Sequence, residues 1–223
     1  MITYDVTDCR ARIIRPGENL VAYCTKNKPF ACINASLYSP DKTPTGTLIE
    51  NGKQTHSAGN GFGVGIPSDS DGKLTFGKPW DRKWDEYLTG YNSPVQNGAY
   101  VDPGFEDKYV FNGYLTRIGL GQKDGRMYIV CDDGVTLKQF AQRAIAQGFD
   151  TLVNLDGGAS RHVWYDRRAR YNSYRVPYNA IVFLDDSDAA LDWARREGFV
   201  TDEADRKIAT ALYRYHKKYN PTK

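Results

Sequence analysis

The most regular pattern of apolar and polar positions lies in residues 137–148, where apolar residues recur at the spacing of an amphipathic helix. Thr136 is a candidate N-cap for this helix, and Gly148 is a candidate residue just beyond its C-terminus. Before the helix, the apolar residues 126–131 predict a buried strand, and after it a second apolar run ends at Asp156. The pattern therefore predicts a strand, a helix and a second strand in succession.

A strand–helix–strand unit of this length is normally a right-handed crossover, which makes its two strands parallel. The first strand is expected to end at a turn formed by Asp132, Asp133 and Gly134, and the second at a turn that begins with Asp156. Both turns are then expected at the carboxyl end of one sheet, the edge at which open α/β sheets bind ligands.

The rest of the chain predicts strands before this unit and helices after it. Residues 1–38 indicate strands and a short helix or loop, and residues 39–79 indicate a turn-rich β meander. Towards the C-terminus, residues 189–197 and 203–219 indicate two further helices. The expected fold class is therefore α+β: a mixed β-sheet core with a strand–helix–strand unit, followed by a C-terminal helical extension.

We place the boundary of the extension between residues 1–184 and residues 185–223, where the composition changes. Ser187 and Thr201 are candidate N-caps of its two helices. The sequence leaves three roles open for the extension: it covers the core, it joins two copies of the chain into a homo-oligomer, or it binds a partner.

Composition limits the classes of function. Of the 223 residues, 40% are hydrophobic and 26% are charged, as in compact globular proteins. The net charge of +3 comes from interspersed basic and acidic residues, so no basic stripe favours nucleic acid as a partner. No apolar run is long enough for a membrane span, and the N-terminal residues lack the pattern of a signal peptide. We therefore expect synthesis in the cytoplasm, with later release or association with a virion left open.

Residues 153–162 concentrate candidate chemistry at the end of the second predicted strand. Asp156 supplies a carboxylate, and Gly157 and Gly158 lack side chains, so their backbone N–H groups can approach an anion closely. Arg161 adds a planar donor group that suits phosphate. Together these groups predict a site for a sugar-like, phosphorylated substrate, although an Asp-capped turn alone would also give this short pattern.

Other short blocks accompany this segment along residues 30–184. They are residues 33–38 (INASLY), Gly46, residues 51–53 (NGK), residues 62–66 (FGVGI), residues 117–121 (RIGLG), residues 132–134 (DDG) and residues 175–181 (RVPYNAI). With residues 154–160 (NLDGGAS), these blocks resemble, in order, the motifs of the phosphodiester glycosidase family. The family often has glycine where this chain has Ala35, Ser36 and Ala159.

The resemblance implies a hydrolase that cleaves a sugar-1-phosphodiester in a phosphorylated glycan or a cell-wall glycopolymer of bacterial or phage context. In the catalytic group, Asp156 is the expected nucleophile or general base, Asp133 is its expected partner, and Asn34 is expected to bind a sugar hydroxyl or N-acetyl group. Residues expected to bind substrate are Arg117, Arg175, Gly157, Gly158, Ser160, Arg161 and Ser36. We expect no cofactor and no metal ion, because no metal-ligand spacing is present.

Leaving-group chemistry separates the candidate functions. An alkoxide must be protonated by a general acid as it leaves, so ordinary glycosidases use two carboxyl groups. A departing phosphate is already a stable anion, and nearby positive charge can stabilise it. A second carboxyl close to Asp156 would therefore favour a hydrolase of peptidoglycan glycosidic bonds or nucleotide-sugars on the same scaffold. A non-catalytic glycan-binding module is the third reading.

Overall fold

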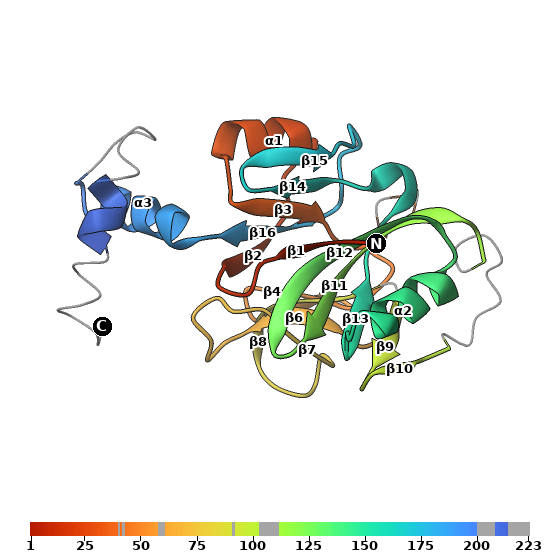
Figure 1. The fold of residues 1–223 in the computed structure, drawn as a ribbon. Coiled ribbons are helices and arrows are strands. Elements are labelled where there is room, and N and C mark those ends of the chain that lie inside the picture. The colour runs from red at the N-terminus through yellow and green to blue at the C-terminus, as the bar shows by residue number, and fades with distance from the viewer. Residues whose placement is uncertain are drawn as a thin grey trace.

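The computed structural model describes residues 1–39, 41, 43–57, 61–90, 92–102, 112–199 and 208–213, and its strands form three antiparallel sheets (Figure 1). In spatial order, the six-stranded sheet contains β1 (Ile2–Asp5), β12 (Arg126–Val135), β11 (Leu115–Lys123), β13 (Thr151–Asn154), β9 (Asn92–Gln96) and β10 (Ala99–Tyr100). One five-stranded sheet contains β15 (Arg168–Tyr171), β14 (Val163–Tyr165), β3 (Ala31–Asn34), β16 (Ala180–Leu184) and β2 (Arg10–Ile14). The other contains β5 (Lys53–His56), β4 (Leu48–Glu50), β8 (Trp84–Thr89), β6 (Gly63–Pro67) and β7 (Thr75–Gly77).

Helices α1 (Leu20–Asn27), α2 (Leu137–Ala146) and α3 (Asp186–Arg196), together with the short 3₁₀ turn η1 (Gly158–Ser160), accompany these sheets. Residues 208–213 are also helical. The predicted α+β class is therefore confirmed, with strands making up the larger share. Within the described ranges, no helix has the length and apolar character needed to cross a membrane.

The predicted strand–helix–strand unit is present as β12, α2 and β13 (Figure 1). Both strands pair antiparallel with β11, which lies between them, so they run parallel to each other without being neighbours. The first strand does not end at the predicted turn. It continues through Gly134, whose φ of 61° is easy for glycine, and ends at Val135. The carboxyl ends of β12 and β13 still lie at the same edge of the sheet.

Helix α2 forms where the periodicity predicted it because its ends and its buried face are both satisfied. The Thr136 side chain accepts a hydrogen bond from the Gln139 N–H, and the Gln139 side chain accepts one from the Thr136 N–H. Leu137, Phe140 and Ala144 are buried on the face that contacts β9, β10 and β12. The helix thereby covers part of the six-stranded sheet and fixes the position of β13.

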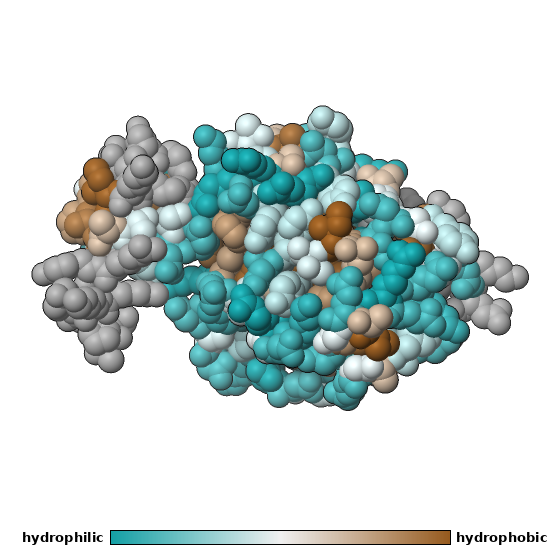
Figure 2. Space-filling model, viewed as in Figure 1, coloured by the Kyte–Doolittle hydropathy of each residue, from teal (hydrophilic) through white to brown (hydrophobic). Residues whose placement is uncertain are grey.

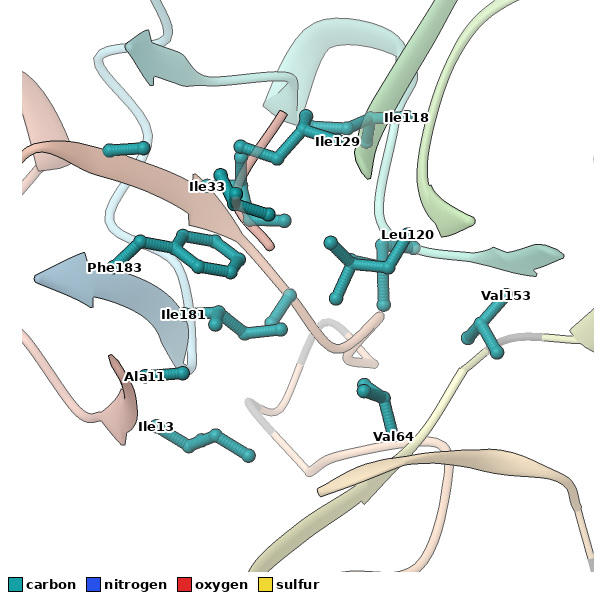
Figure 3. Packing of buried hydrophobic residues seen from close by; sticks show 14 of the residues in the cluster. Ala11, Ile13, Ile33, Val64, Ile118, Leu120, Ile129, Val153, Ile181 and Phe183 are labelled. Carbon is teal, nitrogen blue, oxygen red and sulfur yellow. The ribbon is translucent and has the colours of Figure 1, made fainter. Parts of the chain in front are cut away.

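The main hydrophobic core lies where the three sheets meet (Figure 3). Ile33 and Phe183 come from one five-stranded sheet, Val64 comes from the other, and Ile118 and Leu120 come from the six-stranded sheet. Each of these five side chains is at most 1% exposed. The segments that follow β3 and β13 are therefore anchored to one shared apolar interior.

The C-terminal extension contains α3 and the helical residues 208–213, and α3 extends away from the sheets (Figure 1). Asp185 caps α3 in place of the predicted Ser187, because its side chain accepts hydrogen bonds from two N–H groups of the first turn. Thr201, the candidate cap of the second helix, lies outside the described residues. Figure 2 shows apolar side chains gathered on this extension, where Ile208 is 57% exposed.

The first turn of α3 is bonded to the body of the protein. The Asp188 carboxylate accepts a hydrogen bond from the Phe30 N–H over 3.0 Å. The Arg167 guanidinium donates to the Asp185 carboxylate over 2.8 Å, and it also contacts Asp188. The start of the extension is thus held against β3 and β15 by charged groups as well as by the covalent chain.

Candidate active site

A cavity of about 240 Å³ opens at the edge of the six-stranded sheet, where β11 begins and β13 ends. Its lining consists of Leu37, Leu115, Thr116, Arg117, Asn154, Leu155, Asp156, Gly157, Gly158, Ala159, Ser160 and Arg175. Six of the ten site residues expected from the sequence are in this lining: Arg117, Asp156, Gly157, Gly158, Ser160 and Arg175. The structure places the other four, Asn34, Ser36, Asp133 and Arg161, outside the lining.

Asp156 is the carboxylate of the cavity. It lies just after β13 and is only 9% exposed. Burial raises its pKa to about 6, against the opposing effects of a hydrogen bond from Ser160 and the positive charge of Arg175. A carboxyl group that titrates near neutral pH suits a base or nucleophile, and buried active-site acids commonly have this property.

Asn34 lies beneath the loop that carries Asp156. Its amide nitrogen donates to the Asp156 carbonyl oxygen, and its amide oxygen accepts a hydrogen bond of 2.8 Å from the His162 N–H. The side chain is buried, with 1% exposure. Asn34 therefore lies outside the lining of the cavity, and its amide nitrogen and oxygen both bond to the backbone beneath it.

The two glycines after Asp156 serve different needs. A Cβ atom on Gly157 would lie 2.4 Å from the Thr116 carbonyl oxygen, so only glycine allows this close approach to β11. Gly158 has a φ of 55°, which other residues rarely adopt. Among the described residues, no acceptor pairs with the backbone N–H groups of Gly157, Gly158 and Ala159. These N–H groups belong to residues that line the cavity, and an anion-binding role for them stays a prediction.

Arg117 brings a buried positive charge to the same cavity. It is 3% exposed and donates to two backbone carbonyls, that of Val135 over 3.2 Å and that of Gly113 over 3.0 Å. In the part of the chain that the structure describes, no carboxylate lies within 4.0 Å of its guanidinium. Burial lowers its pKa to about 10. An anion bound in the cavity would supply a charge partner that the described residues do not provide for this guanidinium.

Arg175 contributes a second guanidinium from the segment before β16. Its Nη1 donates to the Ser160 hydroxyl over 3.3 Å. Its backbone N–H donates to Ser173, whose hydroxyl in turn donates to the Ala159 carbonyl over 3.0 Å. These bonds tie the Arg175 segment to η1, so both arginines and Asp156 border one cavity although they come from three separate segments.

Asp133 and Arg161 pair with each other outside the cavity. Arg161 Nη1 lies 2.5 Å from Asp133 Oδ1, and its guanidinium stacks 3.4 Å from the centre of the Tyr171 ring. Asp133 also accepts a hydrogen bond of 2.8 Å from the Thr116 hydroxyl. In this ion pair, each of the two charges has the other as its partner. The structure therefore places the expected second carboxylate, Asp133, and the expected third arginine, Arg161, outside the lining of the cavity that Asp156 borders.

Several residues that support the site were not identified from the sequence. Asn179 accepts a hydrogen bond from the Ser36 N–H over 2.8 Å and donates one to the Ser36 hydroxyl over 3.1 Å, so the Asn179 side chain holds the backbone after β3. Burial, and then the negative charge of Asp156, raise the pKa of Tyr38. Asn154 lines the cavity directly, and its place in the NLDGG block was the one available signal.

Neither histidine nor metal chemistry is evident among the described residues of the site. His162 is 1% exposed, its Nε2 atom lies 3.9 Å from the Cys24 sulfur, and burial lowers its pKa to about 4. It is a packed side chain that stays neutral near neutral pH. Over the described ranges, no three His, Cys, Asp or Glu side chains converge as metal ligands would.

Comparison with known proteins points to one family. Residues 27–213 match the family described as phosphodiester glycosidase. No protein with a curated functional description matches the chain in sequence. In fold, the chain is similar to the zebrafish N-acetylglucosamine-1-phosphodiester α-N-acetylglucosaminidase catalytic domain auto-inhibited by its pro-peptide, with a TM-score of 0.64, 15% identity and coverage of 82% of each chain.

Two further solved structures share this fold. A hypothetical protein from Synechocystis aligns with a TM-score of 0.63 and 13% identity, over 82% of this chain and 58% of that one. A protein from Burkholderia pseudomallei aligns with a TM-score of 0.57 and 10% identity, over 82% of this chain and 73% of that one. At these identities the structural matches establish a shared fold.

Proposed function

The chain belongs to the phosphodiester glycosidase family, and from this premise we propose that it is a hydrolase that cleaves a sugar-1-phosphodiester, or a related anomeric linkage, in a phosphorylated glycan or cell-wall glycopolymer. The zebrafish enzyme named above acts on a phosphodiester of N-acetylglucosamine, as its name states. For the present chain we propose only the class of substrate, a sugar joined through its anomeric carbon to a phosphodiester.

The observation that carries the proposal is the charge content of the cavity. Among its lining residues that the structure describes, Asp156 is the sole carboxylate, and it is accompanied by the two guanidinium groups of Arg117 and Arg175. One carboxylate and two cations suit a leaving group that departs as an anion and needs no proton. They do not suit an alkoxide, which requires a second acid.

In the proposed reaction, the sugar lies with its anomeric carbon beside Asp156 and its phosphate beside the two arginines. The bond between the anomeric carbon and the phosphate oxygen breaks, and the electron pair stays on the phosphate. Asp156 either attacks the anomeric carbon and forms a glycosyl ester that water then hydrolyses, or it removes a proton from a water that attacks the anomeric carbon directly. Each role requires the ionised carboxylate. Because its pKa is about 6, we expect the rate to fall as the pH drops below that value.

The buried Arg117 would stabilise charge that grows on the phosphate during bond cleavage. Its surroundings are dry, so its attraction for an anion is stronger than in water. The free N–H groups of Gly157 and Gly158 would add neutral donors on the same side. Stabilisation that increases from the bound substrate to the transition state raises kcat as well as affinity.

The test is hydrolysis of a matched pair of substrates, one with phosphate and one with a neutral alcohol on the same anomeric carbon. We expect the wild type to cleave the phosphodiester and to leave the neutral glycoside intact, and Asp156→Asn to abolish cleavage. Cleavage of the neutral glycoside in preference would support the alternative hydrolase. Binding of both compounds without cleavage of either would support a glycan-binding module.

A further inference from the structure

Two asparagines, one in the lining of the cavity and one on the neighbouring strand, have buried amide atoms without a hydrogen-bond partner among the described residues. Asn154 lines the cavity at the end of β13 and is 2% exposed. Its Oδ1 atom is buried and, within the part of the chain that the structure describes, accepts no hydrogen bond. The Oδ1 and Nδ2 atoms of Asn92 are buried and unpartnered in the same way.

Strand pairing places these two residues side by side. Asn92 begins β9 and is the direct register partner of Asn154 in the antiparallel pair with β13. Residues directly opposite each other in an antiparallel pair point to the same face of the sheet. The side chain of Asn92 is therefore directed to the face from which Asn154 borders the cavity.

Unpartnered buried amides are rare in folded proteins, because each one forgoes its bonds to water. The other buried asparagines near the site show the usual arrangement, since Asn34 and Asn179 each make at least two hydrogen bonds to the chain. Asn154 and Asn92 thus differ from their neighbours. Their polar atoms are arranged for a group that the described chain does not provide.

We propose that Asn154 and Asn92 are specificity-determining residues that recognise the hydroxyl or N-acetyl groups of the sugar bound beside Asp156. The Oδ1 atom of Asn154 is an acceptor, so it requires a hydroxyl or an amide N–H as donor. Asn92 offers both an acceptor and a donor, which a sugar hydroxyl can satisfy in both senses. Sequence reasoning assigned the sugar contact to Asn34, whereas the structure leaves these two amides to make it.

Substrate selection follows from the same unpaired atoms. A site built to bond a substrate hydroxyl discriminates against an analogue that lacks it, because the buried amide is then left unpaired. Asn154 is two residues before Asp156, so the recognised sugar is the one that carries the reacting anomeric carbon. The proposal rests on the proposed function for this choice of ligand, and its test therefore uses binding without turnover.

The experiment measures binding of sugar-1-phosphates to the full chain by calorimetry. The probes are N-acetylglucosamine 1-phosphate, glucose 1-phosphate, and the analogues of glucose 1-phosphate that each lack one hydroxyl. We expect at least one deletion to weaken binding to the wild type by about tenfold, the effect of one lost hydrogen bond. In Asn154→Ala or Asn92→Ala the parent and that analogue should bind equally. Asn27→Ala, an exposed change far from the cavity, should keep the wild-type discrimination.

Thermal stability gives an independent readout. Since Asn154 Oδ1 has no partner in the described chain, we expect Asn154→Ala to unfold at the wild-type temperature or above it. A structural asparagine would behave differently, and Asn34→Ala, which removes two buried hydrogen bonds, serves as that comparison. A clear loss of stability in Asn154→Ala, or unchanged discrimination among the sugars in both alanine variants, would overturn the proposal.

The experiments distinguish a failure of the sugar-recognition site from a failure of the proposed hydrolysis. If the wild type cleaves no phosphodiester but binds sugar-1-phosphates with discrimination that depends on Asn154, the proposed reaction fails and the recognition site stands. If phosphodiesters are cleaved and the alanine variants still discriminate among sugars as the wild type does, the reaction stands and the recognition site is lost.

Discussion

Asn34 closes the loop that carries Asp156: its side chain donates to the Asp156 carbonyl oxygen, and it also accepts from the His162 N–H at the far end of the loop. One buried amide thereby connects β3 to both ends of the segment that carries the Asp156 carboxylate. The carboxylate is positioned by a residue that the cavity does not contain.

We expect Asn34→Ala to lower kcat more than it raises KM, because the substrate contacts remain while the carboxylate loses its support. Two buried hydrogen bonds are lost, so the free energy of unfolding should fall by about 2 kcal/mol. Steady-state kinetics and urea unfolding measure the two effects. Asn34→Asp keeps the acceptor for His162 but places an oxygen against the Asp156 carbonyl, so it should not restore activity.

We expect the free energy of unfolding to be lower when the Asp156 carboxyl group is ionised. The fold raises its pKa from 3.8 to about 6, so the folded protein holds the proton more tightly than the unfolded chain does. The penalty is absent below pH 3.8, grows as the pH rises through that interval, and reaches about 3 kcal/mol above pH 6. Asp156→Asn should therefore be inactive, and at pH 8 more stable than the wild type by up to that amount.

Urea unfolding at pH 8 and at pH 4 checks this prediction, since the advantage of Asp156→Asn should largely disappear at the lower pH. A variant that is less stable than the wild type at pH 8 would mean that the ionised carboxylate is well compensated in the fold. His162 contributes a trend of the opposite sign, because its lowered pKa favours the folded state as the pH rises from about 4 towards 6.5. Because the wild type and Asp156→Asn both contain His162, the difference between their unfolding free energies reports on Asp156.

The two arginines of the cavity should be sensitive to replacement by lysine, which keeps the charge but loses the planar set of donors. We expect Arg117→Lys and Arg175→Lys each to reduce kcat/KM for a phosphodiester by at least about tenfold, a loss of about 1.4 kcal/mol in transition-state stabilisation. Inorganic phosphate should inhibit the wild type and inhibit both variants more weakly.

Arg161→Lys is the matched control, since its guanidinium is already paired with Asp133 outside the cavity. Its kcat/KM should stay near the wild-type value. Equal loss in all three variants would indicate that the phosphate binds elsewhere, and no loss in Arg117→Lys or Arg175→Lys would make a neutral glycan the better substrate.

Adjacent glycines should respond unequally to alanine. In Gly157→Ala, the new Cβ would meet the Thr116 carbonyl oxygen, a backbone atom of β11, at 2.4 Å. We expect the loop to shift, activity to be lost, and stability to fall by about 2 kcal/mol or more. Gly158→Ala meets no atom within 4 Å and has only the strain of its positive φ, a cost of about 1 kcal/mol. Comparison of the two variants by kinetics and thermal unfolding tests the close approach.

The sequence predicted the local features of this protein better than the assembly of the site. Helix α2 was predictable because its capping residues and its apolar stripe are adjacent in the chain. Asp156, Gly157 and Gly158 were predictable as a group for the same reason. Their position at the edge of the sheet also followed from the strand–helix–strand pattern.

The directions of individual side chains were not accessible from sequence. Asp133 and Arg161 have the residue types of a phosphate and sugar site, yet they pair with each other outside the cavity lining. Asn34 and Asn154 are both asparagines at strand ends within family-like blocks. Only the paired strands reveal that one bonds to the loop and the other borders the cavity.

The hydrogen bonds at the start of α3 connect the extension to the body of the protein beyond the last core strand, β16. Composition places the boundary before residue 185, but Phe30 and Arg167 in the body of the protein use Asp185 and Asp188 as acceptors. A shortened chain that stops at the boundary drawn from composition would leave those donors without their acceptors. For expression or crystallisation, we expect the minimal folding unit to extend at least through the first turn of α3. Beyond that turn, Tyr213 also accepts a hydrogen bond from Arg10 of β2 over 2.9 Å.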